Sequence, residues 1–165
     1  STGDPLFYGV ARFLCDKLGK DQFDVIPHVS SMQLAFARVK ESWDDAFLVN
    51  VATQSLDRIV EKARLAEKVG LFTNDEVTPR HVAQALLDAE IDYFFAYVCE
   101  NLGSPDECVT HGSLVDVSQQ EFGLLNVMVL VRKPMVPTVL LNLLGSDFSA
   151  TRMKCFCSPF RSEVC

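Results

Sequence analysis

The sequence lacks clusters of lysine and arginine, although 15 basic residues are spread over its 165 positions. Acidic residues outnumber them at 22, which gives a formal net charge of −7 at pH 7. A protein that binds a nucleic-acid backbone concentrates positive charge on one face, so we expect no nucleic-acid partner. With 48% hydrophobic and 22% charged residues, the composition is typical of a folded globular protein.

Long hydrophobic segments are also missing. The run at residues 124–131 is too short to cross a bilayer and contains Asn126. The first residues do not show a basic segment followed by an apolar one, which is the pattern of a secretory signal peptide. We therefore expect no membrane association and a cytoplasmic location.

The six cysteines form no C-x-x-C pair. Cys15 and Cys99 lie within apolar runs and are predicted to be small buried side chains. Cys155, Cys157 and Cys165 lie close to the C-terminus without a histidine nearby. This pattern favours free thiols, and we expect no metal site.

The sequence shows no Ser-His-Asp arrangement and no paired carboxylates, so no catalytic residue can be assigned. The three histidines are predicted to lie in a turn (His28), in the first turn of a helix (His81) and near an edge strand (His111), without a chemical role. The aromatic residues at 93–97 are more typical of a core than of a ligand platform. For Glu100 and Asp106 two interpretations remain: they line a cleft, or they are solvent-exposed residues of a loop.

Apolar spacing and turn residues predict alternating helices and strands, and therefore an α/β layer fold. Helices are expected to start near Val10, near Ser30 or Ser31, near Leu56, and at Thr78-Pro79, with Gly19 and Gly70 as helix ends. The expected strands are 24–26, 46–51, 69–73, 91–99, 108–114 and 124–131. A polar turn at 41–45 and a change of character after residue 133 predict three regions, 1–43, 44–133 and 134–165.

Two bends stand out within this pattern. The first, Gly3-Asp4-Pro5, leads into a helix, and the second, residues 26–31, ends in the pair Ser30-Ser31. Bends between strand and helix that carry glycine, aspartate and serine are where α/β proteins bind small polar ligands. The sequence therefore predicts that the two bends share one binding crevice.

Several motifs follow these bends in a fixed order: GDPLFYG at 3–9, the double-serine turn, SWDDA at 42–46 and ENLGSPDE at 100–107. Together they resemble the class III tetrapyrrole methylases, and within these the precorrin-6Y C5,15-methyltransferase family of cobalamin biosynthesis. The resemblance extends over about residues 1–133. It implies a partial N-terminal lobe, which lacks the first strand of the family, and a C-terminal α/β lobe with a mixed sheet. Residues 134–165 are expected to be a linker or the start of a further domain.

The resemblance also implies that S-adenosylmethionine binds between the lobes. Three contacts would come from the opening bend, two from the second bend and two from the C-terminal lobe. The implied cofactor-binding residues are Thr2, Gly3, Asp4, Ser30, Ser31, Thr73 and Leu102.

By the same resemblance the substrate would be a tetrapyrrole, a precorrin methylated at C5, and the protein would be a homodimer. Because such substrates carry many carboxylates, Arg12, Arg38 and Arg80 are candidate contacts. His28 stands where many family members have glycine. Two alternatives remain: a catalytically incompetent dimerising module, or another class III methylase that acts on diphthine or ribosomal RNA.

Overall fold

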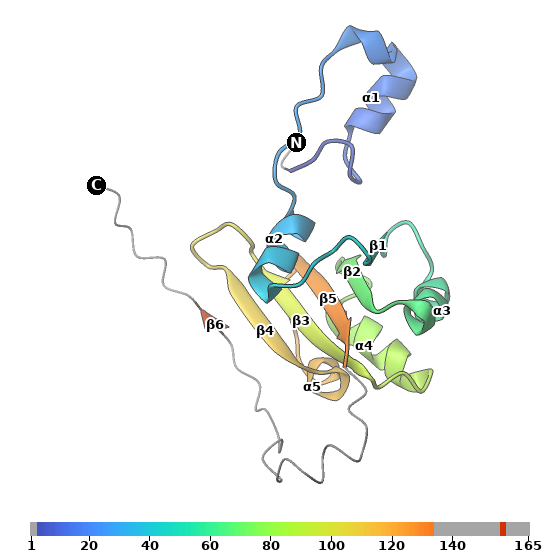
Figure 1. Cartoon of the computed structure of the whole chain (residues 1–165), viewed down its shortest axis with the longest axis vertical. Coiled ribbons are helices and arrows are strands. Elements are labelled where there is room, and N and C mark those ends of the chain that lie inside the picture. Colours follow the sequence, from blue (N-terminus) through green and yellow to red (C-terminus); the bar gives the residue numbers. More distant parts are fainter. Residues whose placement is uncertain (1–2, 134–155, 158–165) are drawn as a thin grey trace, which may run out of the picture.

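A mixed sheet forms the centre of the computed structural model, which describes residues 3–133 and 156–157 (Figure 1). The strand order is β1-β2-β5-β3-β4-β6. Strands β1 and β2 are parallel, and all other neighbouring pairs are antiparallel, so the predicted mixed sheet is confirmed. The strands are β1 (Phe47–Asn50), β2 (Lys68–Phe72), β3 (Phe94–Glu100), β4 (Cys108–Ser113), β5 (Asn126–Arg132) and β6 (Phe156–Cys157).

Three helices, α3 (Leu56–Leu65), α4 (Pro79–Asp88) and α5 (Leu114–Ser118), cover one face of this sheet. Their buried side chains include Ile59 and Leu86. Because side chains alternate along a strand, Phe94, Ala96 and Val98 of β3 point into this core. This cluster is the larger of the two cores.

A single helix, α2 (Ser31–Val39), covers the other face (Figure 1). It lies so close to β2 that a Cβ atom added at Gly70 would be 2.6 Å from Met32 Sδ and 2.9 Å from Phe36 Cε2. We had expected Gly70 to end a helix, and that prediction is wrong. Helix α3 ends at Leu65, and Gly70 lies inside β2, where only a residue without a side chain admits α2.

Two helix starts predicted from capping residues are confirmed. Ser30 is the N-cap of α2 and forms a capping box with Gln33. Thr78 is the N-cap of α4, and Pro79 occupies the first helical turn. Each cap satisfies backbone N–H groups that have no partner within the helix.

The N-terminal segment departs from the predictions. Helix α1 (Ala11–Leu18) forms and ends at Gly19 as expected, but Figure 1 shows it projecting away from the sheet. Its apolar side chains, such as Phe13 at 60% exposure, are largely in contact with solvent, and Cys15 is only half-buried. The strand expected at 24–26 is irregular backbone, because no neighbouring strand in the described part of the chain pairs with it.

The prediction for the apolar run at 124–131 is confirmed in part. Strand β5 begins at Asn126, and Leu124 and Leu125 stay outside the sheet. In residues 3–133 and 156–157, no helix has the length and apolar character needed to cross a membrane. The cysteines at 155 and 165, like Thr2, lie outside the described residues.

Candidate functional site

A pocket of about 570 Å³ opens where the central strands of the sheet end. Phe72 at the end of β2 and Cys99 near the end of β3 both lie opposite Val127 at the start of β5, and all three line the pocket. Because β5 runs antiparallel to its two neighbours, its first residues meet their last ones. The pocket is therefore built on the three strands at the middle of the sheet.

Three of the residues predicted to bind a cofactor line this pocket: Ser31, Thr73 and Leu102. Ser31 is the first residue of α2, Thr73 follows β2, and Leu102 belongs to the loop after β3. Three segments that are far apart in the sequence thus meet at this pocket.

The opening bend joins the same region through Ser30. Gly3 has a φ of +80°, in the left-handed region that favours glycine. A Cβ atom at this position would lie 3.2 Å from the Ser30 Cα and 3.6 Å from the Val29 carbonyl oxygen. The two bends are therefore in contact, and glycine permits this close approach. That they share one binding crevice stays a prediction.

Two other predicted residues, Asp4 and Ser30, form hydrogen bonds within their own bends. Asp4 Oδ1 accepts a hydrogen bond from the Leu6 N–H at 2.9 Å, and the Ser30 hydroxyl accepts one from the Gln33 N–H at 3.2 Å. Neither residue is among those that line the pocket, nor is Gly3. In this structure their side chains shape the bends rather than the pocket wall.

Sequence analysis missed several polar groups of the pocket. Asn126 accepts a hydrogen bond from the Thr73 hydroxyl and donates its own amide N–H to the Gly123 carbonyl at 2.6 Å. Its presence inside an apolar run was the available signal. Of the two acidic residues left open, Asp106 lines the pocket, whereas Glu100 accepts the Gly123 N–H at 2.6 Å.

The pocket has apolar walls beside these polar groups. Phe72, Leu102 and Val127 form its inner part, and Leu124 and Leu125, which are 69% and 75% exposed, lie at the mouth. Apolar walls with a few placed amides and hydroxyls suit a flat ring with polar edges.

The chemistry of the pocket excludes a cysteine nucleophile. Burial raises the pKa of the Cys99 thiol to about 12, with a smaller contribution from nearby Glu107, so the thiol stays protonated near neutral pH. This confirms Cys99 as a small buried side chain. Across the described ranges, no group of histidine, cysteine and acidic residues is placed to bind a metal ion.

Two of the arginines that we had considered for substrate carboxylates are paired within the chain. Arg38 binds Glu107, and Arg80 binds Glu121. His28 is exposed and His81 completes the capping box of α4, but His111 was expected in solvent and is instead half-buried against Phe95 and Tyr97.

The fold and the pocket define the class of this protein: it is an α/β protein with a pocket at the ends of its central strands. The sequence profile of Tetrapyrrole (Corrin/Porphyrin) Methylases matches residues 1–118. The chain therefore belongs to the tetrapyrrole methylase family.

Curated relatives agree with this assignment. The precorrin-6Y C(5,15)-methyltransferase [decarboxylating] of a Sinorhizobium species is 31% identical over 110 residues, which cover 67% of this chain and 27% of that protein. The cobalt-precorrin-7 C(5)-methyltransferase of Salmonella typhimurium is 31% identical over 109 residues, which cover 65% of this chain and 52% of that protein. The chain thus spans between about a quarter and about a half of these relatives.

A solved structure supports the fold. The uroporphyrin-III C-methyltransferase of Thermus thermophilus, crystallised with S-adenosylhomocysteine, superposes with a TM-score of 0.60 at 17% identity. The match covers 78% of this chain and 60% of that one.

Proposed function

We propose that this chain acts as an S-adenosylmethionine-dependent C-methyltransferase that methylates carbon C5 of a precorrin in cobalamin biosynthesis. The observation that carries the proposal is the convergence of Ser31, Thr73 and Leu102 on one pocket, with Gly3 packed against the bend that leads into it. The family assignment and the names of the curated relatives support the reaction and the substrate.

The residues of the pocket fit the cofactor. Phe72 and Leu102 offer apolar surface for a base, while Asn101, Thr73 and Ser31 offer amide and hydroxyl groups for the polar edges of a nucleoside. The volume of about 570 Å³ is that of an ordinary small-molecule site.

Methyl transfer asks little acid–base chemistry of the protein. S-adenosylmethionine supplies an electrophilic methyl group, and the sulfur departs as a neutral thioether. The task of the chain is to align donor and acceptor and to keep water away. Thr73 and Asn126 hold each other by a hydrogen bond in the pocket, and Leu124 and Leu125 add apolar surface to its lining.

The first test is a calorimetric titration with S-adenosylhomocysteine. We expect one site per chain, and a Thr73→Val variant should bind about fivefold more weakly because it loses roughly 1 kcal/mol of hydrogen bonding. Ser118→Ala removes a hydroxyl that bonds the Val115 carbonyl in α5, outside the pocket, and should leave the affinity unchanged. Absence of binding to the unaltered chain would refute the proposal.

The second test is methyl transfer from labelled S-adenosylmethionine to a precorrin, to ribosomal RNA and to diphthine-type substrates. Transfer to the precorrin alone is expected. Transfer to RNA or to a diphthine precursor would assign the chain to the other branch of the family.

A non-catalytic, dimerising module is the second candidate, and the exposed apolar side chains of Leu6, Phe13 and Ile26 favour it. The titration separates the two, because a module would bind no cofactor. We also propose that the chain forms a homodimer through this apolar surface, which light scattering would test. A cytoplasmic location is our further proposal, supported by the free thiols of Cys15 and Cys99.

A further inference from the structure

The loop after β3, residues 101–107, forms one wall of the pocket. Asn101, Leu102, Ser104 and Asp106 all belong to its lining. At its start, the Asn101 N–H donates to the Leu125 carbonyl at 2.9 Å, which ties the loop to the opposite rim. Within the loop, the Ser104 N–H donates to the Asn101 carbonyl at 3.0 Å. These local bonds curl the loop but do not connect it to α2.

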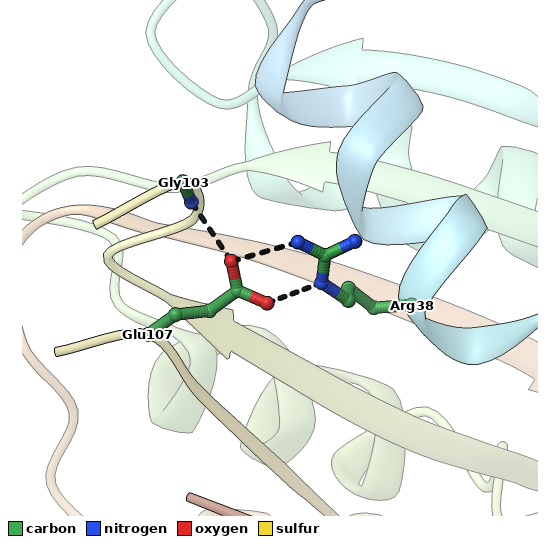
Figure 2. A network of polar contacts seen from close by, with 3 residues as sticks. All are labelled: Arg38, Gly103 and Glu107. Atoms are coloured by element: carbon green, nitrogen blue, oxygen red, sulfur yellow. Dashed lines mark hydrogen bonds and ion pairs between the residues drawn. The ribbon is translucent and has the colours of Figure 1, made fainter. Parts of the chain in front are cut away.

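That connection comes from Glu107, the last residue of the loop. Its carboxylate receives two hydrogen bonds from the Arg38 guanidinium, one from Nε and one from Nη2 at 3.1 Å (Figure 2). The oxygen that faces Nη2 also accepts the N–H of Gly103 at 2.8 Å. One carboxylate thus joins the interior of the loop, at Gly103, and the last residue of the loop to a side chain of α2.

Arg38 is well placed to transmit this connection. It lies in α2, seven positions and therefore two helical turns after Ser31, the pocket residue at the start of the same helix. Helix α2 is itself fixed on the sheet by Met32 and Phe36. The contact therefore links the wall made by the loop to the wall made by the start of α2.

We propose that Arg38 and Glu107 are positioning residues that fix the loop at 101–107 against α2 and thereby set the affinity of the pocket for its nucleoside ligand. The inference rests on the proposed function for the identity of the ligand. Neither residue lines the pocket, so they act through Leu102 and Asn101 rather than by touching the ligand.

The geometry makes this pair stronger than an ordinary surface contact. A guanidinium that meets a carboxylate with two parallel bonds is rigid in both distance and angle. The Glu107 side chain is only 19% exposed, against 40% for Arg38. The bond from Arg38 lowers the pKa of Glu107, so the carboxylate is ionised at neutral pH. Without the pair, the loop would sample other conformations, and only the fraction with an intact wall would bind ligand.

Hydrogen exchange of the ligand-free chain tests the effect on the loop. In Glu107→Gln and Arg38→Met variants, amides of the 101–107 peptide should exchange about tenfold faster than in the unaltered chain, because opening of the loop is no longer opposed. The matched control is Glu67→Gln, which removes the partner of Arg132 at 3.4 Å, at the opposite end of β5. The control should leave the loop unchanged. Equal protection in all variants would overturn the proposal.

Titration with S-adenosylhomocysteine tests the effect on affinity. Both single variants should bind about five- to tenfold more weakly, as expected for a smaller binding-competent fraction, and their melting temperatures should fall by no more than about 2–4 °C. The double variant Arg38→Glu with Glu107→Arg restores the ion pair but not the bond to the Gly103 N–H, so it should recover part of the loss. If the charge at position 107 acted directly on the ligand, the double variant would recover no affinity. That result would overturn the positioning role.

The failure of the two proposals can be told apart. If the unaltered chain binds no S-adenosylhomocysteine, both the proposed function and the proposed effect of Arg38 and Glu107 on affinity are refuted. The hydrogen-exchange rates still decide whether these two residues order the loop. If the unaltered chain binds and the variants bind equally well, the proposed function survives and the positioning role is refuted.

Discussion

Replacing Gly70 by alanine tests how closely α2 packs on the sheet. The added Cβ would lie 2.6 Å from Met32 Sδ and 2.9 Å from both Leu48 Cδ2 and Phe36 Cε2. All three distances are shorter than ordinary van der Waals contact. The three atoms are ends of side chains that pack between α2 and the sheet, so at least one of these side chains must shift.

Two effects of opposite sign determine the magnitude. Alanine in a strand is favoured over glycine by about 0.5–1 kcal/mol of backbone entropy. Overpacking a filled core costs about 1–3 kcal/mol. Because three neighbours overlap at Gly70, we expect overpacking to prevail and the free energy of unfolding to fall by roughly 1–2 kcal/mol. At about 2–4 °C per kcal/mol for a chain of this size, the melting temperature should fall by roughly 2–8 °C.

Urea and thermal denaturation followed by circular dichroism measure this change. A double-mutant cycle with Met32→Ala identifies its cause, because removal of the Met32 sulfur makes room for the new methyl group. In that background the cost of Gly70→Ala should shrink by about 1 kcal/mol. A Gly70→Ala variant as stable as the parent, or more stable, would show that α2 does not lie on β2 in this way.

Three further outcomes are expected. Gly3→Ala should weaken S-adenosylhomocysteine binding about tenfold by forcing the two bends apart. Gly19→Ala should not, because Gly19 also has a positive φ but an added Cβ there would lie 3.9 Å from Gln22 Cγ; equal effects in the titration would remove the steric argument. The pKa of Glu107 is lowered by its arginine partner, so the stabilisation it gives is present above the pKa of the unfolded chain and is lost as the pH falls through the lower folded value. Urea titrations of the parent and Glu107→Gln should therefore converge in acid, and a constant difference would contradict this. At pH 8, peptide mapping should find half-buried Cys15 alkylated well before Cys99, whose pKa is raised to about 12, and the reverse order would disprove the burial of Cys99.

The elements that could be predicted from sequence are those with a local signal. Thr78-Pro79 marks a helix start by capping chemistry alone, and the structure has one there. The motif at residues 100–107 was correctly predicted to be a loop, and Leu102 within it lines the pocket. Local chemistry and family motifs together identified Ser31, Thr73 and Leu102.

What escaped prediction depends on distant partners. Gly70 has the same backbone freedom at a helix end and inside a strand, and only the contact with α2 decides between them. The run at 24–26 has strand-like residues, but a strand also needs a neighbour. Asn126 lines the pocket because β5 lies antiparallel between β2 and β3. The sequence near Asn126 does not indicate this strand order.

The position of β5 has a consequence for how the chain must be assembled. Strands β2 and β3 are synthesised first, yet they never pair with each other, because the later β5 lies between them. Until residue 132 has emerged from the ribosome, both carry an unpaired edge that can recruit a neighbouring chain. Strand β5 thus joins the two halves of the sheet and also completes the pocket, so a nascent chain cannot bind ligand before these two edges are paired.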